Sequence, residues 1–200
     1  MRILVLAIGV TLAGAGVAAA NQATPADAQT SAVGFMGARL GMGLAEWKAL
    51  TYPGRNPAQV RTLCSEDSIG TAGSRPGPGA SAQSGNAVVC TYANRLGKVT
   101  LPLSFPLTNA YLVREPKYVF VGGRLARVGF RTSIDAFNDL TARFEARYGP
   151  ATQTLHDDVT TRSGLDLPRV RKIWRLASGS VEIIDPSTPP TQLAVQFTGR

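Results

Sequence analysis

The sequence lacks the short motifs that mark the common catalytic and nucleotide-binding sites. It has no GxSxG, no HExxH, no Walker loop and no GxGxxG that leads into a helix. Histidine is nearly absent, because His156 is the only one. Asp157 and Asp158 follow it, but a strand would send His156 and Asp157 to opposite faces, and the spacing does not fit one face of a helix. We therefore expect a solvated turn or edge there, and no catalytic residue, metal ligand or cofactor site in the chain.

Cysteine is also scarce, since Cys64 and Cys90 are the only two. They lie in the strand-like segments 60–66 and 87–94, and neither belongs to a CxxC motif or has a histidine neighbour, which disfavours a catalytic thiol. Two cysteines in an exported chain most simply form one disulfide. We predict a Cys64–Cys90 bond, which would stabilise the fold by about 3–4 kcal/mol in the chain-entropy model.

No strongly apolar run reaches the ~20 residues that a membrane-spanning helix needs. Residues 1–20 instead combine Arg2, a short apolar run and a small-residue end, AAA, which is typical of a secretory signal peptide cleaved before Asn21. A membrane anchor is the alternative. Residues 21–31 are predicted to be a disordered leader. Because no cysteine lies near the cleavage site to carry a lipid, we expect a periplasmic or secreted protein without an integral membrane span after signal removal.

Acidic residues are outnumbered, since 21 basic and 13 acidic residues give a net charge of +8, or +7 once Arg2 is removed. The basic residues are scattered along the chain, and the longest local cluster consists of Arg169, Arg171, Lys172 and Arg175. Nucleic-acid binding needs a contiguous basic face with interleaved aromatic residues. We see none in the sequence and expect no nucleic acid as a partner, whereas an anionic envelope polymer stays an alternative.

The most informative segment is a predicted hairpin around Gly122-Gly123, a pair that supplies the positive φ angles of a tight turn between two β-rich runs. The predicted cross-strand partners are Val121 with Arg124, Phe120 with Leu125, Val119 with Ala126, and Lys117 with Val128. The predicted apolar face carries Val119, Val121, Ala126, Val128 and Phe130.

A helix over 132–148 is predicted to follow this hairpin. Thr132 and Asp135 have the spacing of a helix cap, and Gly149-Pro150 ends the pattern. Its apolar residues recur at spacings of three and four and form one stripe: Ile134, Phe137, Leu140, Phe144 and Tyr148. We expect this stripe to pack on the apolar face of the hairpin, on Val119, Val128 and Phe130.

The remaining elements are shorter. Segment 43–52 predicts a short helix, with Trp47 assigned to packing. A second hairpin is predicted over 170–185 around Ser178-Gly179, which would place Leu176 opposite Val181 and Arg175 opposite Glu182. Further strands are expected at 152–159 and around Leu193, Val195 and Phe197, with either an edge strand or a broken pair of strands at 99–107. The Gly-, Pro- and Ser-rich segment 68–86 predicts a flexible surface loop.

Together these elements predict an α+β fold, in which an antiparallel β-sheet is packed by two main helices at about 43–52 and 132–148. Two tandem helix-plus-sheet units are the alternative arrangement. Residues 32–200 are expected to form a single domain, since the length suits one sizeable core.

Two stretches resemble the small envelope proteins of the SmpA/OmlA type and the tandem β-lactamase-inhibitor-protein fold. They are GMGLAEW at 41–47 and YVFVGGRLARV at 118–128. The resemblance implies a helix-on-antiparallel-sheet scaffold that binds other proteins, in outer-membrane assembly or in enzyme inhibition. This chain departs from the pattern because it lacks the lipid-bearing cysteine and has a second helix with further strands.

The predicted function is that of an exported, non-enzymatic protein of the cell envelope that binds another protein through its sheet face. Two alternatives stay open from the sequence. One is an envelope hydrolase with an unrecognised site, and the other is a binder of anionic envelope polymers.

Overall fold

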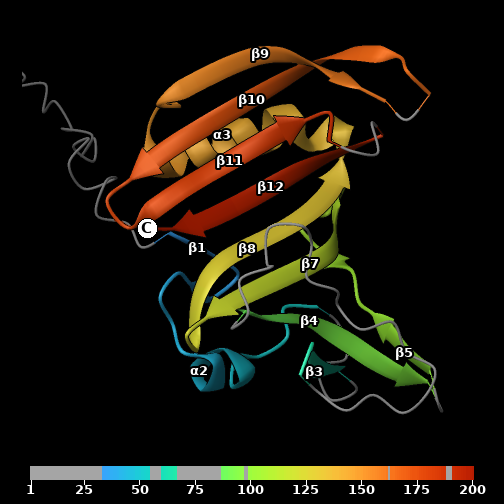
Figure 1. Cartoon of the computed structure of the whole chain (residues 1–200), viewed down its shortest axis with the longest axis vertical. Coiled ribbons are helices and arrows are strands. Elements are labelled where there is room, and N and C mark those ends of the chain that lie inside the picture. The colour runs from blue at the N-terminus through green and yellow to red at the C-terminus, as the bar shows by residue number, and fades with distance from the viewer. Residues whose placement is uncertain (1–32, 55–59, 67–86, 97–98, 162, 188–190) are drawn as a thin grey trace, which may run out of the picture.

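The computed structural model describes residues 33–54, 60–66, 87–96, 99–161, 163–187 and 191–200 (Figure 1). The predicted signal peptide at 1–20, the leader at 21–31 and the loop at 68–86 lie outside these residues. The helical segments are α2 (Leu44–Lys48), the 3-10 turn η2 (Ile134–Ala136) and α3 (Phe137–Tyr148). The strands are β1 (Gly34–Phe35), β2 (Ala38–Arg39), β3 (Val60–Cys64), β4 (Ala87–Leu96), β5 (Val99–Pro102), β6 (Phe105–Pro106), β7 (Leu112–Val121), β8 (Arg124–Ser133), β9 (Gln153–Thr160), β10 (Asp166–Leu176), β11 (Gly179–Asp185) and β12 (Gln192–Gly199).

One antiparallel sheet dominates the described part of the chain. Its strands follow the order β3-β4-β7-β8-β12-β11-β10-β9, while β5 pairs with β4 and β6 pairs with β7. Strand β12, at the end of the chain, lies between β8 and β11 and joins the two halves into one sheet (Figure 1). Strands β1 and β2 form a separate two-stranded sheet.

The predicted α+β fold with two main helices is wrong. More than half of the described residues lie in strands, and the one long helical segment there, η2 with α3, has 15 residues. The helix expected over 43–52 is reduced to α2, from Leu44 to Lys48. Gly43 gives it no side-chain cap, and five residues cannot repay the cost of helix nucleation without tertiary packing.

The first hairpin forms around Gly122 and Gly123, whose φ angles of 58° and 76° fit the predicted tight turn. Its register agrees with the prediction only next to the loop. A bulge between Val119 and Phe120 pairs Val119 with Arg127 and Lys117 with Gly129. The predicted apolar face is therefore wrong for Val119, Val121 and Ala126, because the bulge changes which side chains are buried, whereas Val128 and Phe130 are buried as predicted. The buried set is Tyr118, Phe120, Leu125, Val128 and Phe130.

The second hairpin turns one residue earlier than predicted. Leu176 pairs with Gly179, so Trp174 and not Leu176 lies opposite Val181. Gly179 is the first residue of β11. Only glycine fits there, because a Cβ would lie 2.2 Å from the carbonyl oxygen of Thr198 on the neighbouring strand. The last strand is confirmed, since its alternate side chains are fully buried at Leu193, Val195 and Phe197.

Helix α3 packs on β10, β11 and β12 rather than on the first hairpin, so the expected contact with Val119, Val128 and Phe130 is wrong. Phe144 contacts the rings of Trp174 and Phe197, with centroids 5.5 and 5.9 Å away. The predicted cap at Thr132 is also wrong, because β8 continues to Ser133, whose Oγ accepts a hydrogen bond from the Asp135 amide at 3.3 Å. The helix ends at Gly149 as predicted, with φ 80°.

The other half of the same sheet face is covered by α2 and by β1–β2. Trp47 is fully buried among Tyr92, Tyr118 and Phe120, which confirms its assignment to packing. Phe35 of β1 stacks on Phe130 at 4.5 Å. All three covering elements therefore pack on one face of the sheet, and no described helix covers its other face, which carries the alternate side chains of the strands.

Candidate functional site

The single histidine lies in β9 at an edge of the sheet, as predicted. His156 and Asp157 pair with Val170 and Arg169 of β10, so their side chains point to opposite faces. Arg169 Nε donates a hydrogen bond of 2.7 Å to Asp157 Oδ1, and this bond holds the pKa of the Asp157 carboxyl below its usual value. The described residues contain no group of three or more potential metal ligands. The carboxylate beside the histidine thus already has a structural partner.

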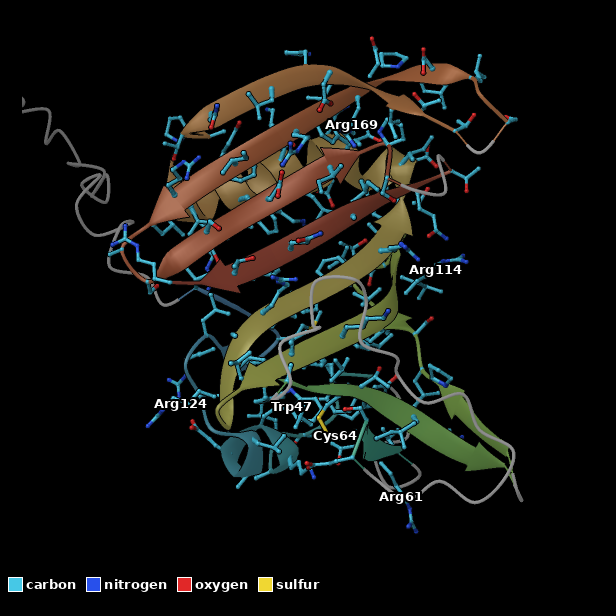
Figure 2. All side chains as sticks on the ribbon, viewed as in Figure 1. Trp47, Arg61, Cys64, Arg114, Arg124 and Arg169 are labelled. Atoms are coloured by element: carbon cyan, nitrogen blue, oxygen red, sulfur yellow. A yellow bond between two sulfur atoms is a disulfide. The ribbon has the colours of Figure 1, made fainter. Side chains whose placement is uncertain are left out.

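The candidate site is instead the sheet face opposite the helices. We call the outward side chains of β7, β8, β12, β11, β10 and β9, apart from Val121 and Arg124 at the hairpin turn, the open face. Its basic members are Arg114, Lys117, Arg127, Arg131, Arg169, Arg171 and Arg175. Its described carboxylates are Asp157 and Glu182. Figure 2 shows Arg114 and Arg169 far from Arg61, which projects from the opposite end of the molecule.

The strand register arranges part of the open face in one row. Arg114 lies directly opposite Arg131, and the row continues across the sheet through Ala194 and Ile184 to Arg171. With neighbouring strands about 4.8 Å apart, this row spans roughly 19 Å. The row therefore places two basic side chains, those of Arg114 and Arg131, directly opposite each other at one end.

Both described carboxylates of the open face are held in ion pairs. Arg171 Nη2 lies 2.5 Å from Glu182 Oε1, and Arg169 Nη2 lies 2.5 Å from Asp157 Oδ2. The hydrogen bond from Arg169 to Asp157 raises the pKa of Arg169, which therefore stays charged. Seven cations and two carboxylates leave a net charge of +5 on the described side chains of this face.

This surface was missed in the sequence, where the basic residues look scattered. The sequence does contain one signal of it, namely basic residues two or four positions apart within a predicted strand. Residues two apart in a strand share a face, so such a spacing indicates a basic surface. Arg169, Arg171 and Arg175 follow it on β10, as Arg127 and Arg131 do on β8. The two strands come together only through β11 and β12, and no local pattern predicts that strand order.

The predicted disulfide is confirmed. Cys64 and Cys90 face each other across β3 and β4, with an S–S distance of 2.02 Å. Neither cysteine is a free thiol, and the bond ties the short edge strand β3 to the sheet. Among the described residues, no helix is long and apolar enough to cross a membrane.

Comparison with protein-family models, with curated proteins and with solved structures gives no match to this chain. The resemblance to the SmpA/OmlA type and to the β-lactamase-inhibitor-protein fold stays a prediction.

Proposed function

We propose that this chain is an exported, non-enzymatic protein of the cell envelope that binds a partner protein with an acidic surface through the open face. One observation carries the proposal, namely the row in which Arg114 lies opposite Arg131. Facing basic side chains attract an acidic surface, because complementary charges steer association and fix the orientation of the partner.

The composition of the open face suits a protein partner better than a purely ionic one. Val119, Ile173 and Ile184 lie half-buried among the basic side chains. Specific protein interfaces combine apolar contacts with charged groups that give orientation and rate. The ion pairs of Arg169 and Arg171 hold those two side chains in place, and such preorganisation lowers the entropy lost on binding.

Export rests on two observations of different kinds. The first is the signal-peptide pattern of residues 1–20. The second is the Cys64–Cys90 disulfide, because such bonds persist in oxidising compartments and are rare in the cytosol. Both observations support a periplasmic or secreted location.

A second candidate function is binding of an anionic envelope polymer, and the net charge of +5 on the open face favours it. Electrostatic attraction would then replace shape complementarity as the source of affinity. The two candidates differ in whether a discrete protein is bound.

The test compares two double variants that each remove two positive charges. Arg114→Ala/Lys117→Ala alters the open face, whereas Lys48→Ala/Arg143→Ala alters exposed positions on α2 and α3 on the covered side. Tagged proteins are crosslinked in the producing cells and purified. We expect one discrete protein to co-purify with the wild type and with the helix variant, and to be lost with the open-face variant.

The same comparison separates the two candidates. Loss of the partner from both variants, or from neither, would contradict a role for the open face. If no protein is captured, but the purified chain binds an anionic polysaccharide that is released between about 50 and 200 mM salt, the second candidate replaces the first.

A further inference from the structure

A pocket of about 610 Å³ lies on the β4–β6 half of the molecule and reaches the start of β7, where Leu112 lines it two residues before Arg114. The loop and strand residues 103–112 form one wall, and Tyr52, Val60 and Asn94 form the other. Its volume falls within the range of about 300–1,000 Å³ that is usual for small-molecule sites. The proposed function makes no use of this pocket.

The aromatic walls of the pocket are held in place by their own hydroxyl groups. Tyr52 Oη donates a hydrogen bond to the carbonyl oxygen of Ser104 at 3.2 Å, and Tyr111 Oη donates one to the carbonyl oxygen of Asp135 at 3.1 Å. Thr108 Oγ1 accepts hydrogen bonds from the Ala110 and Tyr111 amides at 3.1 and 3.2 Å, which fixes the turn between the walls. The pocket is therefore preorganised, and little order is lost when a ligand enters.

Two polar side chains in this pocket have no hydrogen-bond partner among the described residues. Within the part of the chain that the structure describes, the side-chain amides of Asn94 and Asn109 make no hydrogen bond. Each amide offers two donors and an acceptor oxygen. Asn94 is half-buried in β4, so a ligand that meets its amide would recover hydrogen bonds that burial takes from water.

The described lining of the pocket is uncharged although the protein is strongly basic. None of the described residues that line it carries a charge, whereas the whole chain carries +8. An anionic ligand would gain more on the open face, and a purely apolar ligand would leave the two amides unsatisfied. The lining thus selects a ligand that is polar, uncharged and able to cover an aromatic ring.

We propose that this pocket binds a neutral saccharide unit. A pyranose ring presents an apolar C–H face that fits the held ring of Tyr111, together with a rim of hydroxyl groups that can donate to and accept from Asn94 and Asn109. Leu103, half-buried, supplies an apolar floor. Aromatic and apolar walls with a few convergent polar groups are the usual construction of such sites.

The test is an NMR titration of the full chain with three trisaccharides, namely the N-acetylglucosamine trimer, maltotriose and the anionic galacturonic acid trimer. We expect a neutral trimer to shift the amide signals of Asn94, Asn109 and Tyr111 and to bind more tightly than the anionic one. The exposed Asn109→Ala should weaken binding by about twofold to tenfold, which is the usual value of one neutral hydrogen bond. Tyr111→Ala should remove binding, whereas Tyr111→Phe keeps the ring but loses the hydrogen bond to Asp135, and should bind more weakly than the wild type without losing binding.

Arg143→Ala on α3 is the control variant and should bind like the wild type. The proposal is overturned if neither neutral trimer shifts the pocket signals at about 20 mM, a concentration at which a millimolar site would be nearly full. It is also overturned if only the anionic trimer binds, or if the shifted signals belong to the open face. Tyr111→Phe leaves no cavity and should fold like the wild type. Comparing its binding with that of Tyr111→Ala therefore separates loss of the aromatic surface from loss of folding.

Discussion

Replacing Trp47 with alanine should show that one side chain holds α2 against the sheet. The helix has five residues and no side-chain cap, so it cannot persist without packing. Trp47 has 0% exposure, and its ring lies 4.7 Å from that of Tyr118 and 5.3 Å from that of Tyr92, measured between centroids. Truncating a buried tryptophan to alanine costs about 3–5 kcal/mol. That is a large part of the about 5–15 kcal/mol by which domains are usually stable.

Trp47→Phe is the informative partner variant. The indole Nε1 of Trp47 is buried without a hydrogen-bond partner among the described residues, and an unsatisfied buried donor costs about 1–3 kcal/mol. Phenylalanine loses some buried area but removes this donor, so the net loss should be about 1 kcal/mol and clearly smaller than that of alanine.

Urea unfolding followed by circular dichroism measures both variants, with the fluorescence of Trp174 as a second probe. The reasoning is refuted if Trp47→Ala lowers the free energy of unfolding by less than about 1 kcal/mol, or if Trp47→Phe is as damaging as Trp47→Ala.

Reduction of the Cys64–Cys90 bond should lower the free energy of unfolding by about 3 kcal/mol, because the unfolded chain gains loop entropy; equal urea midpoints for the oxidised and reduced protein would contradict this. Burial raises the pKa of Tyr92 from 10.0 to about 12. The unfolded state therefore loses its phenol proton first, and stability should fall as pH rises from about 10 to 12. Tyr92→Phe should move alkaline unfolding, followed by circular dichroism, to higher pH, and an unchanged midpoint would refute the assignment. Leu140→Ala should cost about 2–5 kcal/mol because Leu140 is 2% exposed. Phe137→Ala should cost less, since Phe137 is only half-buried, and the reverse order in urea unfolding would show that α3 packs differently.

The elements with local signals could be predicted from the sequence. Gly122 and Gly123 located the first hairpin because a tight turn needs positive φ. The stripe that contains Leu140 located the long helix, and strict alternation located the last strand with its buried Val195 and Phe197.

The register and the packing partners could not be predicted, because they depend on distant strands. The bulge after Val119 has no signature of its own in the sequence, and it changes which side chains of the hairpin are buried. Gly179 lies in β11, close to the carbonyl of Thr198 on β12, and the local sequence does not show that neighbour. Strand β12 pairs with β8, about 60 residues earlier in the chain, and loop-closure entropy grows too slowly with length to forbid such pairing.

The candidate site could not be predicted either, because it also depends on the order of distant strands. Arg114, Arg131 and Arg171 come from three strands that only the full sheet order brings into one row. The sequence therefore predicted binding through a sheet face, but it gave no indication of which side chains form that surface.

The central claim is that the open face contacts a partner protein, and site-specific photo-crosslinking tests it most directly. Gln196 lies on β12 near the middle of this face, opposite Glu182 on one side and Gly129 on the other. Asn138 is exposed on α3, on the covered side of the sheet. Benzoylphenylalanine replaces each residue in turn in the producing cells, and adducts are detected after irradiation. We predict a discrete protein adduct from position 196 and none from position 138; adducts from position 138 alone, or identical adducts from both, would contradict the account.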